Sequence, residues 1–283
     1  MSVRTYNPAV RVANWCENLY LEDDILKDFI EKRERGELLI QKSGKLRDKV
    51  LNKVDLSVSR DGYLHFGDRV MILNPGAVDR TKHASGDEPR DDNVISINIS
   101  PSALHSGSSI PAECGVSGSK NTEASARNVF VITSTTGQTT GTLAYREPFY
   151  LCTGDDDERL YLSSEALTFS KVSGKSRHNS VSLVPNPSFG TQFQVLHFNP
   201  KLRMEYEHTP VHANTKVIIN HVQTNHNLAV EQKYKLRTPF GWEYEVSTHT
   251  YLDCHRAEMD VNHFMFVCSV PGDDIAPHVL NNN

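Results

Sequence analysis

The clearest pattern of apolar and polar positions lies near the C-terminal end of the chain, between residues 213 and 269. Val217 and Ile219 are two residues apart, so they fall on one face of a strand. A short apolar strand, a glycine-containing turn, an alternating strand and a closing aromatic strand follow, at 228–230, 240–241, 242–246 and 264–267. This segment therefore predicts a unit of four strands.

The same order of signals occurs twice upstream in weaker form. The second repeat begins at 147–151, continues at 160–164 and closes at 193–196, and the first repeat begins at 67–72 and closes at 128–132. One four-strand unit cannot bury its own apolar face, so three copies predict a mainly β protein with a β-trefoil core. A β-sandwich whose strands happen to be similar is the alternative.

Two stretches within the predicted trefoil, which we place at residues 56–270, have the composition of loops. Residues 75–125 are rich in Gly, Ser, Asp, Asn and Pro, and they predict a flexible insertion around one strand at 94–99. Residues 171–186 predict a second loop, which carries Lys171, Lys175 and Arg177. The polar residues 271–283 predict a disordered tail.

The chain before the trefoil divides into two parts. Residues 1–20 have alternating apolar positions and no helical period, so they predict an extended arm. A helical segment follows at 21–55, with a first helix that has acidic residues at its start and basic residues and Gly36 at its end, and a second helix at 38–51. One face of the first helix is apolar, through Leu21, Ile25, Leu26, Phe29 and Ile30.

Composition restricts the classes of partner and compartment. The 283 residues carry a formal net charge of −5, so nucleic acid is not a favoured partner, although basic residues are in excess between 32 and 53. The five cysteines are an odd number without a C-x-x-C pair, which favours a reducing compartment such as the cytoplasm. We find neither a signal peptide nor about 18 consecutive apolar residues, so we expect no membrane association.

Two groups of residues have the residue types of a catalytic or a phosphate-binding site, but their spacing does not fit such a site. Cys254 and His255 are neighbours, so in an extended segment they point apart and cannot form the thiol–imidazole pair of a nucleophile; we read them and His249 as turn residues. The Gly-Lys-Ser at 174–176 lacks the earlier glycine of a phosphate-binding loop. We therefore expect no catalytic residue, no metal site and no cofactor.

Several segments together resemble the cilia- and flagella-associated protein 161 family. They are Asn7 to Val12 with Asn14-Trp15, Leu26 to Phe29, Gly36 to Gln41, Asp61-Gly62-Tyr63 with Gly67-Asp68, Leu160 to Ser164, Leu202 to Glu207, and Asn220 to His263. The third repeat also resembles the MIR modules of inositol trisphosphate receptors and protein O-mannosyltransferases, in Tyr244-Glu245-Val246 and His249 to His255, and those modules are β-trefoils.

The family resemblance implies a structural microtubule inner protein that supports motile cilia. Such a protein lies in the cilium axoneme, in the A-tubule lumen of doublet microtubules, where it binds α/β-tubulin and other microtubule inner proteins. The residues we expect at those contacts are Val10, Arg11, Val12, Trp15 and Tyr20 of the arm and Lys171, Lys175 and Arg177 of the loop. The alternatives are a trefoil module that binds a small sugar or phosphate ligand and, less favoured, an enzyme.

Overall fold

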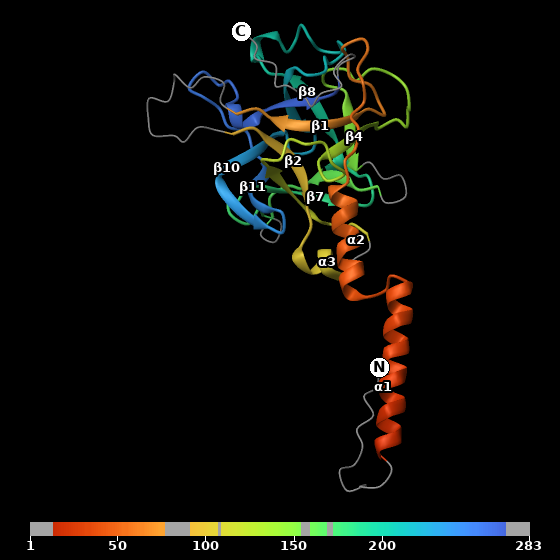
Figure 1. Cartoon of the computed structure of the whole chain (residues 1–283). Coiled ribbons are helices and arrows are strands. Elements are labelled where there is room, and N and C mark those ends of the chain that lie inside the picture. The colour runs from red at the N-terminus through yellow and green to blue at the C-terminus, as the bar shows by residue number, and fades with distance from the viewer. Residues whose placement is uncertain (1–13, 77–90, 107–108, 154–158, 169–171, 270–283) are drawn as a thin grey trace.

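The computed structural model describes residues 14–76, 91–106, 109–153, 159–168 and 172–269 (Figure 1). These residues contain three successive groups of four strands. The first group is β1 (Arg69–Asn74), β2 (Asn93–Asn98), β3 (Gly115–Ser119) and β4 (Val129–Ser134). The second is β5 (Pro148–Thr153), β6 (Tyr161–Ser164), β7 (Asn179–Val184) and β8 (Phe193–His197). The third is β9 (Lys216–His221), β10 (His226–Thr238), β11 (Gly241–Thr248) and β12 (His263–Val267).

The first and last strands of the three groups form a closed barrel of six strands. The antiparallel pairs run in the order β1, β4, β5, β8, β9 and β12, and β12 pairs with β1 again. The two middle strands of each group form a hairpin, and the three hairpins pair with one another through β3, β7 and β11. This arrangement is a β-trefoil, so the predicted fold is confirmed and the sandwich alternative is wrong.

A ring of backbone hydrogen bonds closes one end of the barrel. Leu64 N–H donates to Val211 O at 3.0 Å, Val211 N–H to Leu143 O at 2.8 Å, and Leu143 N–H to Leu64 O at 2.8 Å. All three side chains are fully buried in the core. Because each bond joins two different repeats, the ring ties the three repeats together.

Three residues after each member of this ring, the chain turns in the left-handed region. Gly67, Arg146 and Asn214 have φ of 93°, 64° and 56°. Each donates its N–H to the closing strand of its own repeat, to Ile132 O, Val195 O and Phe266 O at 2.7, 2.9 and 3.0 Å. The turn therefore joins the start of every repeat to its end.

Two strands lie in segments that we predicted as loops. β3 lies in the 75–125 stretch, where the helix α3 (Pro101–Ser106) was also missed, and β7 lies in the 171–186 stretch. β3 reads GVSGS, because the hairpins meet closely there: a Cβ on Gly118 would lie 2.8 Å from Val230 Cγ1. A strand in which close packing requires small residues therefore has the composition of a loop.

The N-terminal segment forms two helices, α1 (Asn14–Glu34) and α2 (Leu39–Leu51). Residues 14–20 are helical, so the predicted extended arm is wrong for them. The negative charge of Glu17 in the first turn stabilises the helix, because it interacts favourably with the positive end of the helix dipole. Residues 1–13 and 271–283 lie outside the described residues. The two helices are joined at Gly36, whose φ is 70°, and Glu37 N–H donates to Lys32 O at 2.8 Å, which confirms the predicted glycine stop.

Only the second of these helices is anchored in the core among the described residues. Leu46 and Val50 of α2 are buried in the main apolar cluster, together with Leu104 of α3. In Figure 1, α1 projects from the trefoil beyond α2. Short 3-10 helices lie at Phe189–Thr191, Pro200–Leu202 and Asp260–Asn262.

A buried ion pair connects the first repeat to the third. Arg127 Nη2 lies 2.6 Å from Glu243 Oε2, and both side chains are about 95% removed from solvent. Arg127 also donates from Nε to Ile97 O at 2.7 Å, and its guanidinium lies 3.9 Å from the centre of the Phe240 ring. Burial opposes the charge of Glu243, but Arg127 and Ser117 outweigh it and the pKa of Glu243 is lowered.

We expect Arg127→Met to lower the free energy of unfolding by about 3–5 kcal/mol, because it leaves a buried carboxylate without its cation. Urea unfolding followed by circular dichroism measures the change. Arg146→Met is the matched control, since Arg146 pairs with Glu207 at 3.1 Å on the surface, where a pair contributes at most about 1 kcal/mol. Equal losses in the two variants would show that the buried pair contributes no more than the exposed one.

Candidate interaction site

Helix α1 presents an apolar face that nothing in the described part of the chain covers. Ile25, Leu26 and Phe29 are 53%, 57% and 46% exposed, and Leu21 and Ile30 are exposed as well. The sequence placed these five residues on one face of a helix, and that placement is confirmed. Exposed apolar residues that gather on one face are typical of a surface that binds a partner.

The helical period defines which residues belong to this face. Leu21, Ile25 and Phe29 follow one another at a spacing of four, and Leu26 and Ile30 form the adjacent row. Tyr20 precedes Phe29 by nine positions and is therefore about 180° away around the helix. Ion pairs of the i,i+4 type, Lys32 with Asp28 at 2.7 Å and Arg35 with Glu31, support the helix without tertiary packing.

The residues that we predicted at partner contacts fall in different parts of the molecule. Val10, Arg11, Val12 and Lys171 lie outside the described residues. Trp15 and Tyr20 belong to α1, where Tyr20 is exposed. Lys175 and Arg177 are exposed on the trefoil, in the turn before β7, and Lys175 N–H donates to Glu245 Oε1 at 3.0 Å.

A buried polar cluster surrounds Glu231 of β10, and sequence reasoning missed it. His178 Nδ1 lies 2.9 Å from Oε1, Ser247 Oγ donates to Oε1 at 2.8 Å, and the Tyr251 hydroxyl donates to Oε2 at 2.8 Å. The rings of His178 and His249 stack, with centroids 3.9 Å apart. No local signal could have shown this cluster, because His178 and Glu231 are 53 positions apart and only the trefoil brings them together.

The electrostatics of this cluster favour a structural role. Burial and then the hydrogen bond to Glu231 raise the pKa of Tyr251, so its phenol stays protonated and remains a donor. Burial and then the neighbouring His178 lower the pKa of His249, so its imidazole is held neutral. Protein groups occupy both oxygens of the Glu231 carboxylate, which fixes the segment 249–251 against β10.

The Cys254 and His255 pair lies in a tight turn, as expected from the sequence. Asp253 Oδ1 accepts hydrogen bonds from His255 N–H and Ala257 N–H, both at 2.8 Å, and Leu252 bridges to Glu258. Cys254 is exposed there. The polar groups of this turn thus hold its backbone in place.

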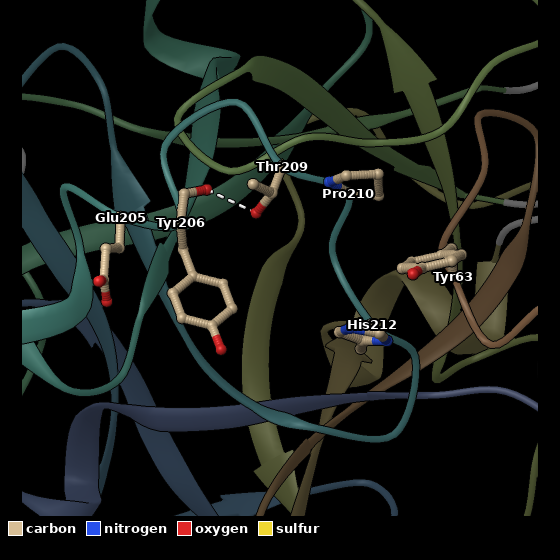
Figure 2. Close-up of a pocket in the computed structure, with 6 residues that line it drawn as sticks. All are labelled: Tyr63, Glu205, Tyr206, Thr209, Pro210 and His212. Atoms are coloured by element: carbon tan, nitrogen blue, oxygen red, sulfur yellow. Dashed lines mark hydrogen bonds between the residues drawn. The ribbon is translucent and has the colours of Figure 1, made fainter.

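A pocket of about 360 Å³ opens beside the closed end of the barrel. It is lined by Tyr63, Glu205, Tyr206, Thr209, Pro210 and His212. Figure 2 shows the Tyr206 ring on one side and Tyr63 with His212 on the other, and the Tyr63 and His212 rings are 4.6 Å apart. Thr209 Oγ1 donates to Tyr206 O at 2.7 Å, which shapes the wall between them. Aromatic faces and one carboxylate are suited to a neutral, hydroxyl-rich ligand.

The described ranges were searched for groups of metal ligands and for helices that could span a membrane. These ranges contain no group of three or more His, Cys, Asp or Glu side chains placed to hold a metal ion. The helices described here include none with the length and apolar composition needed to cross a membrane.

Comparison with protein families and curated proteins identifies related chains. Residues 42–269 match the model of the cilia- and flagella-associated protein 161-like domain. The chain is 40% identical to cilia- and flagella-associated protein 161 of Bos taurus, over 98% of this chain and 86% of that protein. The Danio rerio protein of the same name is also 40% identical, over 96% of this chain and 90% of that protein.

Comparison with solved structures supports the fold. An SDF2-like protein from Arabidopsis thaliana superposes with a TM-score of 0.50 at 12% identity, over 72% of this chain and 94% of that chain. A Caenorhabditis elegans protein of unknown function has a TM-score of 0.50 at 9% identity, over 74% and 98% of the two chains. These likenesses agree with the MIR-like β-trefoil that the third repeat predicted.

We expect the protein to lose stability as the pH falls from 7.5 to 5.5. Burial lowers the pKa of His221 and of His249 in the folded chain. As the pH falls, these two imidazoles therefore become protonated at a higher pH in the unfolded chain than in the folded chain. The stability that the neutral rings contribute is complete above about pH 6.5, the ordinary histidine pKa, and declines below it. The measurement is the urea midpoint at the two pH values.

The variant His221→Gln/His249→Gln should show a smaller loss of urea midpoint over this pH interval than the unmodified chain. His255→Gln removes an exposed imidazole from the turn and should leave the loss unchanged. A double variant with the same pH dependence as the parent protein would show that other groups cause it.

Proposed function

The chain belongs to the cilia- and flagella-associated protein 161 family and is thus a cilia- and flagella-associated protein, and from this premise we propose that it is a structural microtubule inner protein. In this proposal it lies in the A-tubule lumen of ciliary doublet microtubules, binds α/β-tubulin and other microtubule inner proteins, and supports motile cilia. In this proposal its role is to bind these partners and to support the microtubule mechanically, and it catalyses no reaction.

The observation that carries the proposal is the uncovered apolar face of α1. A helix that projects from its domain with Ile25, Leu26 and Phe29 in solvent gains free energy when a partner covers them, at about 25 cal/mol per Å² of apolar area. The trefoil cannot supply that cover, because α1 extends away from it (Figure 1). We propose that the tubulin wall of the lumen supplies it, and that α1 provides the apolar centre of the interface.

The acidic and basic residues of the chain agree with an apolar rather than an electrostatic attachment. The formal net charge is −5, and two basic residues near the C-terminal end of α1, Lys32 and Arg35, pair with Asp28 and Glu31 one turn earlier. Apolar contacts that exclude water are insensitive to screening by salt, whereas exposed charge pairs are weakened by it. These two modes of attachment can therefore be told apart in an axoneme preparation.

We expect the double variant Ile25→Lys/Phe29→Lys to reduce incorporation into axonemes by more than about tenfold, because it places two charges in the centre of the proposed apolar interface. Lysine does not lower helix propensity, and both positions are exposed, so the melting temperature of the trefoil should stay the same. The readout is the ratio of axonemal to soluble protein in ciliated cells that lack the endogenous chain.

Asp24→Lys is the matched control for this variant. It makes the same change of +2 in net charge, at an exposed position five residues before Phe29 and therefore about 140° away from it around the helix. We expect it to incorporate like the unmodified protein. Normal incorporation of the double variant, or an equal loss in the control, would refute the assignment of the interface to this face.

We also expect the protein to stay with isolated doublets in about 0.5 M salt, where the Debye length is roughly 4 Å. The measurement is the fraction that pellets with intact doublets after the wash, compared with a low-salt wash. Release of most of the protein from intact doublets would overturn the lumenal proposal and favour an exposed, electrostatic attachment.

Sugar binding by the trefoil is the second candidate, and the pocket beside Tyr63 favours it. Tyr63, Tyr206 and His212 offer ring faces, and Glu205 offers a carboxylate acceptor, which is the chemistry that binds sugar hydroxyls. The test is the melting temperature of the protein in the presence of a panel of mono- and disaccharides, where binding would give a saturable rise. A rise that Tyr206→Ala abolishes would support this candidate.

A further inference from the structure

The hairpin of β10 and β11 lies at one flank of the trefoil (Figure 1), and basic and aromatic side chains lie on one of its faces. In the register of this hairpin, Lys235 lies opposite Tyr244 and Arg237 lies opposite Trp242. Residues directly opposite in an antiparallel pair share a face, as do residues two apart on one strand. These four side chains therefore lie on a single face, which we name the hairpin face.

A shallow cavity occupies the hairpin face. Its volume is about 310 Å³, and it is lined by Lys120, Lys235, Trp242 and Tyr244. Lys120 comes from the turn after β3, and its Nζ lies 5.7 Å from the centre of the Tyr244 ring. Trp242 is 65% exposed, whereas Tyr244 is buried and forms the floor.

The positive charges of the hairpin face are only partly compensated. Lys120 pairs with Asp91 at 2.5 Å. In the described ranges, no carboxylate pairs with the side chains of Lys235 or Arg237, and Lys175 Nζ donates to the Lys235 carbonyl oxygen, which brings a further cation to the edge of β10. The hairpin face is thus locally basic in a chain whose net charge is −5.

The glutamates of β11 do not neutralise this face, because they alternate onto the other side of the strand. Glu243 is held by Arg127, and Glu245 accepts N–H groups of Lys175 and Ser176 at 3.0 and 2.7 Å. Both are buried. A ligand on the hairpin face would meet cations and aromatic rings, with Asp91 at its margin.

The outer edge of β10 adds backbone groups to this surface. Within the described chain, strand pairing on that edge involves only His226 and Asn227 with β9. Leu228 O accepts from Asn262 Nδ2 at 2.8 Å, and the pairing with β11 shifts in register between Glu231 and Lys235. From Lys235 to Thr238 the strand pairs with β11 and with no other strand of the described chain. An open strand edge can accept an extended segment of another chain.

We propose that the hairpin face binds an acidic, extended peptide segment of a partner protein. Its carboxylates would pair with Lys235, Arg237 and Lys175, and an apolar side chain of the segment would cover Trp242. Nucleic acid fits less well, since a net-negative chain with so few uncompensated cations lacks the broad basic surface that tracks a phosphate backbone. The proposal does not depend on the lumenal location or on helix α1.

Trp242 provides a direct readout of this binding. The chain has two tryptophans, so Trp15→Phe in the full-length protein leaves Trp242 as the only tryptophan, which is excited at a wavelength that the ten tyrosines do not absorb. The probe is an end-capped 12-residue peptide of glutamate and glycine with one leucine. We expect a saturable change in Trp242 emission, weakened by added salt and absent with the same peptide carrying glutamine in place of glutamate.

Charge reversal tests the assignment to this face. On the same background, Lys235→Glu/Arg237→Glu should weaken binding at least about tenfold by anisotropy of the fluorescein-labelled peptide. Lys201→Glu/Arg256→Glu makes the same change in net charge at two exposed positions elsewhere and should leave the affinity within about twofold.

A separate variant, Trp242→Ala, should weaken binding in the anisotropy assay while the melting temperature stays the same, because the side chain is exposed. Any of three outcomes would overturn the proposal. The first is the absence of saturable binding, in which case the lysines would serve only to prevent aggregation through the open strand edge. The others are an equal loss of affinity in the charge-matched control and tighter binding of a single-stranded oligonucleotide than of the peptide.

Discussion

Hydrogen bonding between the three repeats is the constraint on which the whole trefoil depends. Every strand of the barrel has a partner from another repeat, as in the pairs β4 with β5, β8 with β9 and β12 with β1. The ring of Leu64, Leu143 and Val211 repeats this relation at the closed end, since a carbonyl of another repeat accepts each of their backbone N–H groups. No repeat can therefore satisfy its own backbone groups, and the three must fold as one unit.

This constraint also explains where the buried charges lie. Glu231, Glu243 and Glu245 belong to the third repeat, and each is buried near the meeting point of the three hairpins. Groups of the other repeats contact all three: Arg127 of the first repeat binds Glu243, and His178 and the amides of Lys175 and Ser176 of the second bind Glu231 and Glu245. Ser247 and Tyr251 of the third repeat also donate to Glu231. Buried carboxylates whose full set of partners exists only in the assembled trefoil penalise any other arrangement of the hairpins.

The sequence predicted the fold where burial selects β-branched and aromatic residues, and it failed where close packing selects small ones. β9 and β12 were predicted because Val217, Ile219 and Phe264 must fill the barrel. β3 was missed because Gly118 leaves room for Val230, and β7 because its alternating serines and asparagine have the composition of a loop. The amphipathic face of α1 was predicted as well, but periodicity cannot tell whether such a face packs on its own domain or on another molecule. The surroundings of Glu231 depend on contacts across 53 positions, which no local pattern contains.

The glycine turn and the anchoring of α2 have a geometric consequence. Leu46 and Val50 pack α2 against the core of the trefoil, and the hydrogen-bonded turn at Gly36 joins α1 to this anchored helix. With 21 residues, α1 is about 30 Å long, comparable to the diameter of a small domain. In the described part of the chain, the length of this helix therefore sets the separation between its free end and the trefoil. An assembly that engages both ends must offer two attachment points at that separation, so its repeat distance, as well as its surface chemistry, selects where the molecule fits.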